Sequence, residues 1–275
     1  MSTCNTMNDN ETAILEEEKR IEENITKIKH RVAVFSGKGG VGKTTLSVNL
    51  AFGFLLQGNR TALLDADITG PNVSKMLGIK DELIVLNESI IPHEKAGLKS
   101  ISVANLIPKG QPIIWRGPMR SKIINQFLAE VEWGELDYLF SDLPPGTGDE
   151  ILTIAQMMKP DAAVIVTTPQ DVSVIDAERA VNMARKMGIP FIGIVENMSG
   201  FICPECNSVI DFFGRGGGRK LAEELNVAFL GDIPFEINAR KAADRGIPMM
   251  LDKSDSLIKQ KTMDIVNKLK AELNE

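Results

Sequence analysis

The sequence of 275 residues contains only three cysteines, two tryptophans, two histidines and one tyrosine. Three cysteines do not make the disulfide framework of a small secreted protein. The pair Cys203 and Cys206, spaced as C-x-x-C, suggests metal or redox chemistry instead. The two histidines, His30 and His93, are isolated and need no function.

Long hydrophobic runs and an excess of positive charge are also absent. No apolar run reaches the roughly 18 residues of a membrane span, and the polar first ten residues do not resemble a secretory signal. The net charge of −6 gives no general attraction to nucleic acid or to an anionic membrane. We therefore expect a cytoplasmic protein that binds neither. The overall composition is that of an ordinary globular protein.

The first 30 residues differ from the rest of the chain. Residues 11–29 are densely charged, with isoleucines at positions 14, 21, 25 and 28. These spacings place the isoleucines on one narrow stripe of a solvated helix. We expect residues 1–30 to form a charged helical extension, which either packs loosely on its own domain or binds a partner.

From Arg31 onward, short apolar runs alternate with helical patterns, the runs being VAVF, TALLD, YLFSD, AAVIVTT and FIGIVEN. This alternation predicts an α/β fold, a doubly wound and mostly parallel sheet with helices on both faces. We expect one domain over residues 31–275, with a small hairpin insertion between Leu83 and Val103. The last helical pattern is expected to pack on the core. A membrane-targeting helix is disfavoured there because aromatics are few and charges are mixed.

A glycine-rich segment, SGKGGVGKTT, follows the first predicted strand and precedes a helical pattern. It satisfies the phosphate-loop pattern G-x-x-x-x-G-K-[ST] in its proper context. We expect Lys43 to reach the β- and γ-phosphates and the Thr44 hydroxyl to bind Mg²⁺, while backbone N–H groups surround the phosphates. The loop residues expected to bind nucleotide are Gly37, Lys38, Gly39, Gly40, Val41, Gly42, Lys43, Thr44 and Thr45.

Polar residues end three other predicted strands. Asp142 ends YLFSD, where a carboxylate that supports Mg²⁺ through water belongs. Asp65 and Asp67, in LLDADITGPN, end another predicted strand at the edge where open α/β sheets bind ligands. We expect Asp67 to orient the attacking water or a magnesium-bound one, and Asp65 to be structural. Asn197 ends FIGIVEN, and its amide can bind adenine.

Together these segments resemble the deviant Walker A ATPases, the group of MinD, ParA and the nitrogenase iron protein. The resemblance rests on KGGVGKTT, DADITGPN and DYLFSDLPPGTGD. More specific segments, WRGPM, DLPPGTGD, VENMSGFICPEC and FGRGGG, resemble the Mrp/ApbC family of iron–sulfur cluster carrier ATPases. The similarity extends from about residue 31 almost to the C-terminus.

The resemblance implies a role for the second lysine of the loop. In this group the lysine at the position of Lys38 crosses a dimer interface to the partner's ATP, where it stabilises charge that develops during phosphoryl transfer. The resemblance also implies a catalytic part for Lys43 and Asp67. Arg116, in WRGPM, is either structural or a contact to the dimer partner.

For the cysteines the resemblance implies a shared cluster. Two thiolates are half of the four ligands that a 4Fe–4S cluster or a closed zinc site needs. Cys203 and Cys206 of two subunits would together hold one 4Fe–4S cluster on the axis of a homodimer. Bridging zinc and a thioredoxin-like dithiol are the alternatives, and Cys4 is expected to be unligated. The glycines of FGRGGGRK, with Arg215 and Arg219, are expected to shape the region beside the cluster.

The sequence thus predicts a homodimeric ATPase that uses ATP and Mg²⁺, assembles a labile 4Fe–4S cluster and delivers it to apo-proteins. Some relatives carry an N-terminal ferredoxin-like motif or a small extra domain that this sequence lacks, so partners mediated by those modules are doubtful. One alternative is a MinD/ParA-like positioning ATPase without a cluster, which has no need of the cysteines. A second is a reductase component similar to the nitrogenase iron protein, whose cysteines come from separated positions.

Overall fold

The computed structural model describes residues 9–87, 89–106, 117–203, 206, 208–253 and 256–274. The strands of its main sheet are β1 (Ile28–Phe35), β2 (Thr61–Asp65), β5 (His93–Lys95), β6 (Leu98–Ser102), β7 (Leu136–Asp142), β8 (Ala162–Thr167), β9 (Phe191–Ile202), β10 (Val209–Ile210) and β11 (Ala228–Phe235). Their order is β10-β9-β8-β1-β7-β2-β6-β5, with β11 also paired to β9. Of these described strands, only β5 and β10 pair antiparallel, each with the strand beside it. The predicted mostly parallel sheet is confirmed.

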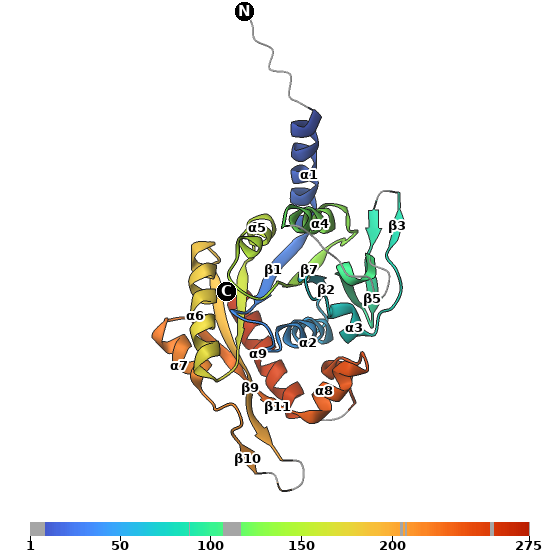
Figure 1. The fold of residues 1–275 in the computed structure, drawn as a ribbon. Helices are drawn as coiled ribbons and strands as arrows, with labels where there is room; N and C mark the ends of the chain where they lie inside the picture. The colour runs from blue at the N-terminus through green and yellow to red at the C-terminus, as the bar shows by residue number, and fades with distance from the viewer. Residues whose placement is uncertain are drawn as a thin grey trace, which may run out of the picture.

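Helices cover both faces of the sheet (Figure 1). One face carries α1 (Asp9–Ile25), α4 (Gly117–Glu130), α5 (Asp149–Met158), α6 (Asp171–Lys186) and α7 (Gly217–Glu224). The other carries α2 (Lys43–Leu56), α3 (Val73–Leu77), α8 (Ile237–Asp244), α9 (Leu257–Asn274) and the short 3-10 helix η2 (Met249–Leu251). Each face has its own apolar core, so the doubly wound architecture is confirmed.

The central strand β1 shows why its sequence is continuously apolar. Val32 and Val34 point into the core beneath α2, whereas Ala33 and Phe35 point into the opposite core. Successive side chains of a strand face opposite sides, so a strand covered by helices on both faces has no polar face. The strand begins at Ile28, before the VAVF run that predicted it.

The predicted hairpin insertion consists of two hairpins. β3 (Ile84–Leu86) and β4 (Ser89–Ile91) form a separate antiparallel pair. β5 and β6 form the second pair, and β6 also joins the main sheet parallel to β2. A short 3-10 helix, η1 (Val103–Leu106), follows β6. The sequence did not indicate that this insertion extends the sheet.

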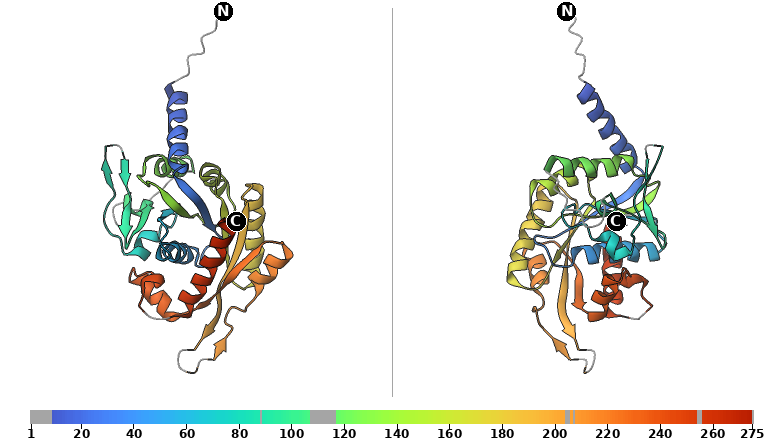
Figure 2. Two further views of the ribbon diagram at one scale, coloured as in Figure 1. Left: turned by 180° about the vertical axis from the view of Figure 1, so that it is seen from behind. Right: turned by 45° about the vertical axis from the view of Figure 1, so that its right-hand side comes forward.

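The N-terminal helix α1 is attached at its C-terminal end only, and Figures 1 and 2 show its first turns projecting from the body of the molecule. Ile21 and Ile25 are buried in the core, and the Asn24 amide donates hydrogen bonds to two carbonyls of α4. Ile14 is 55% exposed. Ile28 was predicted on this helix, which is wrong: it lies in β1 because the helix ends at Ile25.

The boundary between an extension of residues 1–30 and a domain of residues 31–275 stays a prediction. Cys4 and Arg116 lie outside the described residues. Within the described part of the chain, no helix has the length and apolar character needed to cross a membrane.

The C-terminal helix α9 packs on the core, as predicted. Ile265, Val266 and Leu269 are fully buried against α2 and β11. The helices approach closely at Gly53 of α2, because a Cβ there would lie 2.6 Å from Cγ2 of Val266. Glycine at this position therefore sets how near the two helices lie.

We expect Gly53→Ala to lower the free energy of unfolding by about 1–3 kcal/mol, because the added methyl overpacks the contact with Val266. In a Val266→Ala background the same change should be neutral or stabilise by up to about 1 kcal/mol, since alanine is the better helix former. Urea denaturation of the four variants of this cycle measures both effects. Equal destabilisation in both backgrounds would show that the close approach does not determine the cost.

Candidate functional site

Three adjacent strands end together and place the site. β1 lies between β7 and β8, and β7 lies between β1 and β2. The parallel register sets Val34 opposite Asp142 and Asp142 opposite Asp65. Phosphate-loop residues therefore leave β1 level with the two aspartates. This is the carboxyl edge at which open α/β sheets bind ligands.

The phosphate loop joins β1 to α2 and needs its glycines. Gly40 and Gly42 have φ of 81° and 85°, a conformation that side chains disfavour. A Cβ on Gly42 would also collide with the amide nitrogen of Asn197. Gly42 immediately precedes Lys43, the first residue of α2, so the first N–H groups of a buried helix face the loop.

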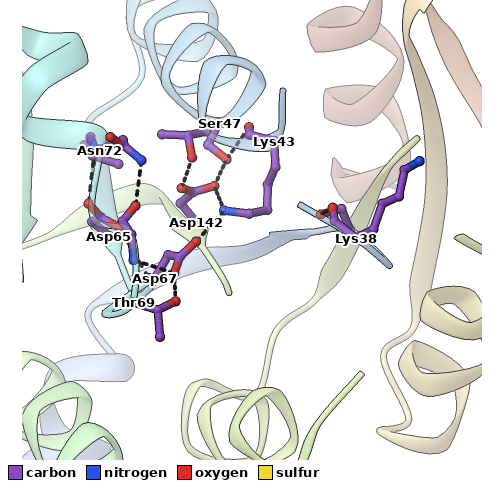
Figure 3. Close-up of polar contacts among 12 residues, drawn as sticks. Lys38, Lys43, Ser47, Asp65, Asp67, Thr69, Asn72 and Asp142 are labelled. Atoms are coloured by element: carbon purple, nitrogen blue, oxygen red, sulfur yellow. Dashed lines mark hydrogen bonds and ion pairs between the residues drawn. The ribbon is translucent and has the colours of Figure 1, made fainter. Parts of the chain in front are cut away.

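The carboxylate of Asp142 is fully buried and holds the start of α2 (Figure 3). Its Oδ1 lies 2.8 Å from Nζ of Lys43 and accepts a 2.7 Å hydrogen bond from the Ser47 hydroxyl. Its Oδ2 accepts a 2.7 Å bond from the Thr44 hydroxyl. The structure thus brings the predicted residues Lys43, Thr44 and Asp142 together. It adds Ser47, which the helical spacing of four from Lys43 could have indicated.

Asp65 and Asp67 face different surroundings. Asp65 is fully buried and accepts hydrogen bonds from the Ser102 hydroxyl and from the N–H groups of Val73 and Asp67. Burial and the Asp142 carboxylate raise the pKa of Asp65 well above its usual value.

The Asp67 side chain reaches the edge of the site. Its Oδ1 accepts bonds from Thr69 and Gly70, and its Oδ2 lies 3.8 Å from Nζ of Lys43. These positions fit a structural Asp65 and an Asp67 placed beside Lys43.

The two lysines of the loop point in different directions. Figure 3 shows the Lys38 side chain directed away from Lys43 and Asp142. The backbone at Lys38 is fixed, because its carbonyl accepts a 2.8 Å hydrogen bond from the Ser36 hydroxyl. Gly37 packs directly on the backbone of Asp176 in α6. Lys43 is therefore neutralised within its own chain, whereas Lys38 extends from a rigid loop away from that cluster.

Asn197 borders a pocket of about 390 Å³ beside the phosphate loop. Its amide donates a 2.8 Å hydrogen bond to the Val41 carbonyl of that loop. Thr44 and Thr45 of the loop also line the pocket. The lining also includes a segment that the sequence did not indicate, namely Pro234 and Phe235 at the end of β11 and Glu236 just before α8. A pocket with an apolar wall and an amide beside the loop suits a planar base.

Cys203 and Cys206 lie at the tip of the hairpin formed by β9 and β10, which projects from the body of the molecule (Figure 1). The Cys203 N–H donates a 3.0 Å hydrogen bond to the Ser208 carbonyl, and the Cys206 thiol lies 3.0 Å from the Ser208 hydroxyl. Hydrogen bonds with Ser208 and with the Cys203 thiol lower the pKa of Cys206. Among the described residues, no third His, Cys, Asp or Glu completes a metal site with them.

The phosphate loop after a central strand, with Lys43 and Thr44 beside the Asp142 carboxylate, defines a P-loop NTPase. Solved structures agree on the fold. A nucleotide-binding protein from Archaeoglobus fulgidus, in complex with ADP, superposes with a TM-score of 0.75 at 37% identity, covering 88% of this chain and 98% of that one. The cell-division ATPase MinD of Pyrococcus furiosus superposes with a TM-score of 0.67 at 19% identity, over 88% of this chain and 99% of that one.

The family is more specific than the fold. A family model described as NUBPL iron-transfer P-loop NTPase matches residues 27–270, and the chain belongs to this family. A protein of Methanocaldococcus jannaschii named iron-sulfur cluster carrier protein is 52% identical over 256 residues, which are 90% of this chain and 88% of that protein. A protein of the same name from Pyrococcus horikoshii is 47% identical, covering 92% of this chain and 91% of that protein.

We expect Asp65→Ala to lower the free energy of unfolding by about 2–4 kcal/mol, because three buried donors lose their acceptor. Asp67→Ala should cost about 1 kcal/mol or less, because solvent reaches Thr69 and can replace the lost acceptor. Denaturation of the nucleotide-free protein compares the two variants. Equal losses would show that Asp65 has no special structural role.

Proposed function

We propose that the chain hydrolyses ATP with Mg²⁺ and carries a labile 4Fe–4S cluster, bound between two copies, to apo-proteins. The observation that carries this proposal is the position of Cys203 and Cys206. They sit at the end of the same strand that brings Asn197 to the phosphate loop. The names of the relatives support a cluster as the cargo.

The residues of the loop fit a magnesium nucleotide. Gly40 and Gly42 carry no side chain and have positive φ angles, which lets the loop backbone curl with its N–H groups toward a phosphate. Lys43 would bind phosphate oxygens, and the Thr44 hydroxyl with the Asp142 carboxylate would hold Mg²⁺, which prefers such oxygen ligands. The bound metal would offset phosphate charge. Asn197 and Phe235 would hold the base, and Asp67 would orient the attacking water.

The cysteine pair supports a shared cluster. Each chain offers two thiols, that of Cys206 exposed and that of Cys203 partly exposed, and a 4Fe–4S cluster needs four thiolates. Two apolar side chains on the surface support a partner subunit: Phe212 beside the hairpin is 68% exposed, and Val172 at the start of α6 is 65% exposed. A cluster held in exposed turns between subunits is accessible to a recipient protein. A positioning ATPase would leave the cysteine pair without a role.

The two lysines are expected to act differently. Lys43→Ala should reduce ATP affinity at least 100-fold, because the phosphates lose their buried cation, a loss of about 3 kcal/mol. Lys38→Ala should change ATP affinity less than threefold but lower kcat at least tenfold, because its contact would form in the transition state between subunits. Equilibrium binding and steady-state hydrolysis separate the two effects. If Lys38→Ala lowers affinity as strongly as Lys43→Ala does, the role across subunits is wrong.

The cluster is tested by anaerobic reconstitution with iron and sulfide. We expect about four iron and four sulfide per two chains, and transfer that activates an apo-enzyme requiring a 4Fe–4S cluster. Cys203→Ala or Cys206→Ala should lose the iron while ATP binding stays within threefold, because the hairpin tip is separate from the phosphate loop. Cys4→Ala is the matched control and should retain the cluster, because this cysteine is expected to be unligated. Zinc without sulfide, or a cluster that survives Cys203→Ala, would contradict the proposal.

A further inference from the structure

Glu196 is a buried carboxylate that none of the roles above uses. It is 1% exposed and lies in β9, next to Asn197. No ion pair to it occurs among the described residues, and three hydrogen bonds satisfy its charge. A buried carboxylate without a cation is costly, so its hydrogen bonds must be well formed for it to be kept.

The three donors belong to two different segments. Oε1 accepts a 2.6 Å bond from the Ser199 hydroxyl and a 2.8 Å bond from the N–H of Gly216. Oε2 accepts a 2.6 Å bond from the N–H of Gly218, in the first turn of α7. Glu196 thus caps α7 from a neighbouring strand and fixes the glycine-rich loop at the same time.

The glycines of that loop permit this approach. A Cβ on Gly218 would lie 3.1 Å from the Cβ of Glu196, and one on Gly217 would lie 2.5 Å from the Pro169 carbonyl oxygen. The segment FGRGGG therefore packs on β9 and on the start of α6. The guanidinium of Arg219 lies over the ring of Phe229, 4.3 Å from its centroid, and so this side chain faces strand β11.

Glu196 also holds a bulge in β9. Asn197 pairs with Ile233 of β11 and Phe201 pairs with Phe235, so residues 198–200 lie opposite a single residue of β11. Met198 and Gly200 have φ of 57° and 78°, in the left-handed region. Such a bulge bends a strand and redirects the residues after it. The side chain of Ser199, between these two residues, is bound by Glu196.

We propose that Glu196 is a positioning residue that fixes the β9 bulge and thereby couples the nucleotide pocket to the cysteine hairpin. On one side of the bulge, Asn197 binds the phosphate loop. On the other, Phe201 contacts Phe235 of the pocket wall, with ring centroids 6.2 Å apart, and leads to Cys203 two residues later. The biological role of this coupling rests on the proposed function, because the coupling would link the bound nucleotide to retention of the cluster.

The test is amide hydrogen exchange of residues 201–210 in the full chain without a cluster, with and without ADP and Mg²⁺. In the wild type, ADP should slow hairpin exchange at least threefold. Glu196→Gln keeps the size but replaces one acceptor oxygen by a donor, and Ser199→Ala removes one donor. Both should lose at least half of that response while ADP affinity stays within threefold. Glu223→Ala, an exposed residue of α7, is the control and should behave as the wild type.

A purely structural Glu196 would speed exchange in both states and leave the response to ADP intact. That result contradicts the proposal, as does a wild-type hairpin that does not respond to ADP. If Glu196→Gln fails to fold, Ser199→Ala still tests the proposal, because it removes only one hydroxyl. Iron and sulfide analysis of the wild type tests the carrier function separately, so failure of the coupling and failure of the function are distinguishable.

Discussion

The buried carboxylate of Asp142 is the contact on which the nucleotide site depends. A buried charge is tolerated only with compensating partners, and Asp142 has one ammonium and two hydroxyls within 2.8 Å. All three partners come from the first two turns of α2, whereas Asp142 ends β7. The carboxylate therefore fixes the helix against the sheet and with it the phosphate loop.

The length of strand β9 places the cysteine pair at a distance from the nucleotide pocket. The core strands β2, β7 and β8 have 5, 7 and 6 residues, and the register sets the last residues of β2 and β7, Asp65 and Asp142, opposite each other. β9 has 12 residues, and Asn197 lies in its middle, level with the phosphate loop. The remaining residues pass through the bulge and continue beyond the sheet edge to Cys203. One strand thus gives the nucleotide pocket an amide and carries the cysteines away from the body.

Local patterns predicted the parts of this structure that depend on local geometry. The phosphate loop needs glycines and one lysine at fixed spacing, so Gly42 and Lys43 were identifiable from their neighbours alone. The strands buried on both faces were identifiable for a similar reason. Ile28 was misplaced because a stripe of isoleucines continues past the residue at which the helix ends.

Parts that depend on distant partners could not be predicted. The sequence does not predict β11, because Gly231 and Pro234 interrupt its apolar run. Glycine is needed at position 231 because a Cβ there would lie 2.8 Å from Cγ1 of Ile265 in α9. Phe235 reaches the nucleotide pocket only through strand pairing with β9. Two of the donors to Glu196 are backbone N–H groups of residues about twenty positions further along the chain. Every residue except proline has such a group, so the sequence does not indicate these contacts.

Two loops border the beginning of α6, and their position supports the proposed partner subunit. The loop that carries Lys38 packs on α6 at Asp176, and the glycine-rich loop next to the cysteine hairpin packs on Pro169 and Val174 at the start of that helix. Val172, in the first turn of α6, is among its most exposed apolar side chains. A second copy seated over the beginning of α6 would meet the loop of Lys38 and the glycine-rich loop that follows the cysteine hairpin. Closure of one interface would then serve both ATP hydrolysis and cluster binding.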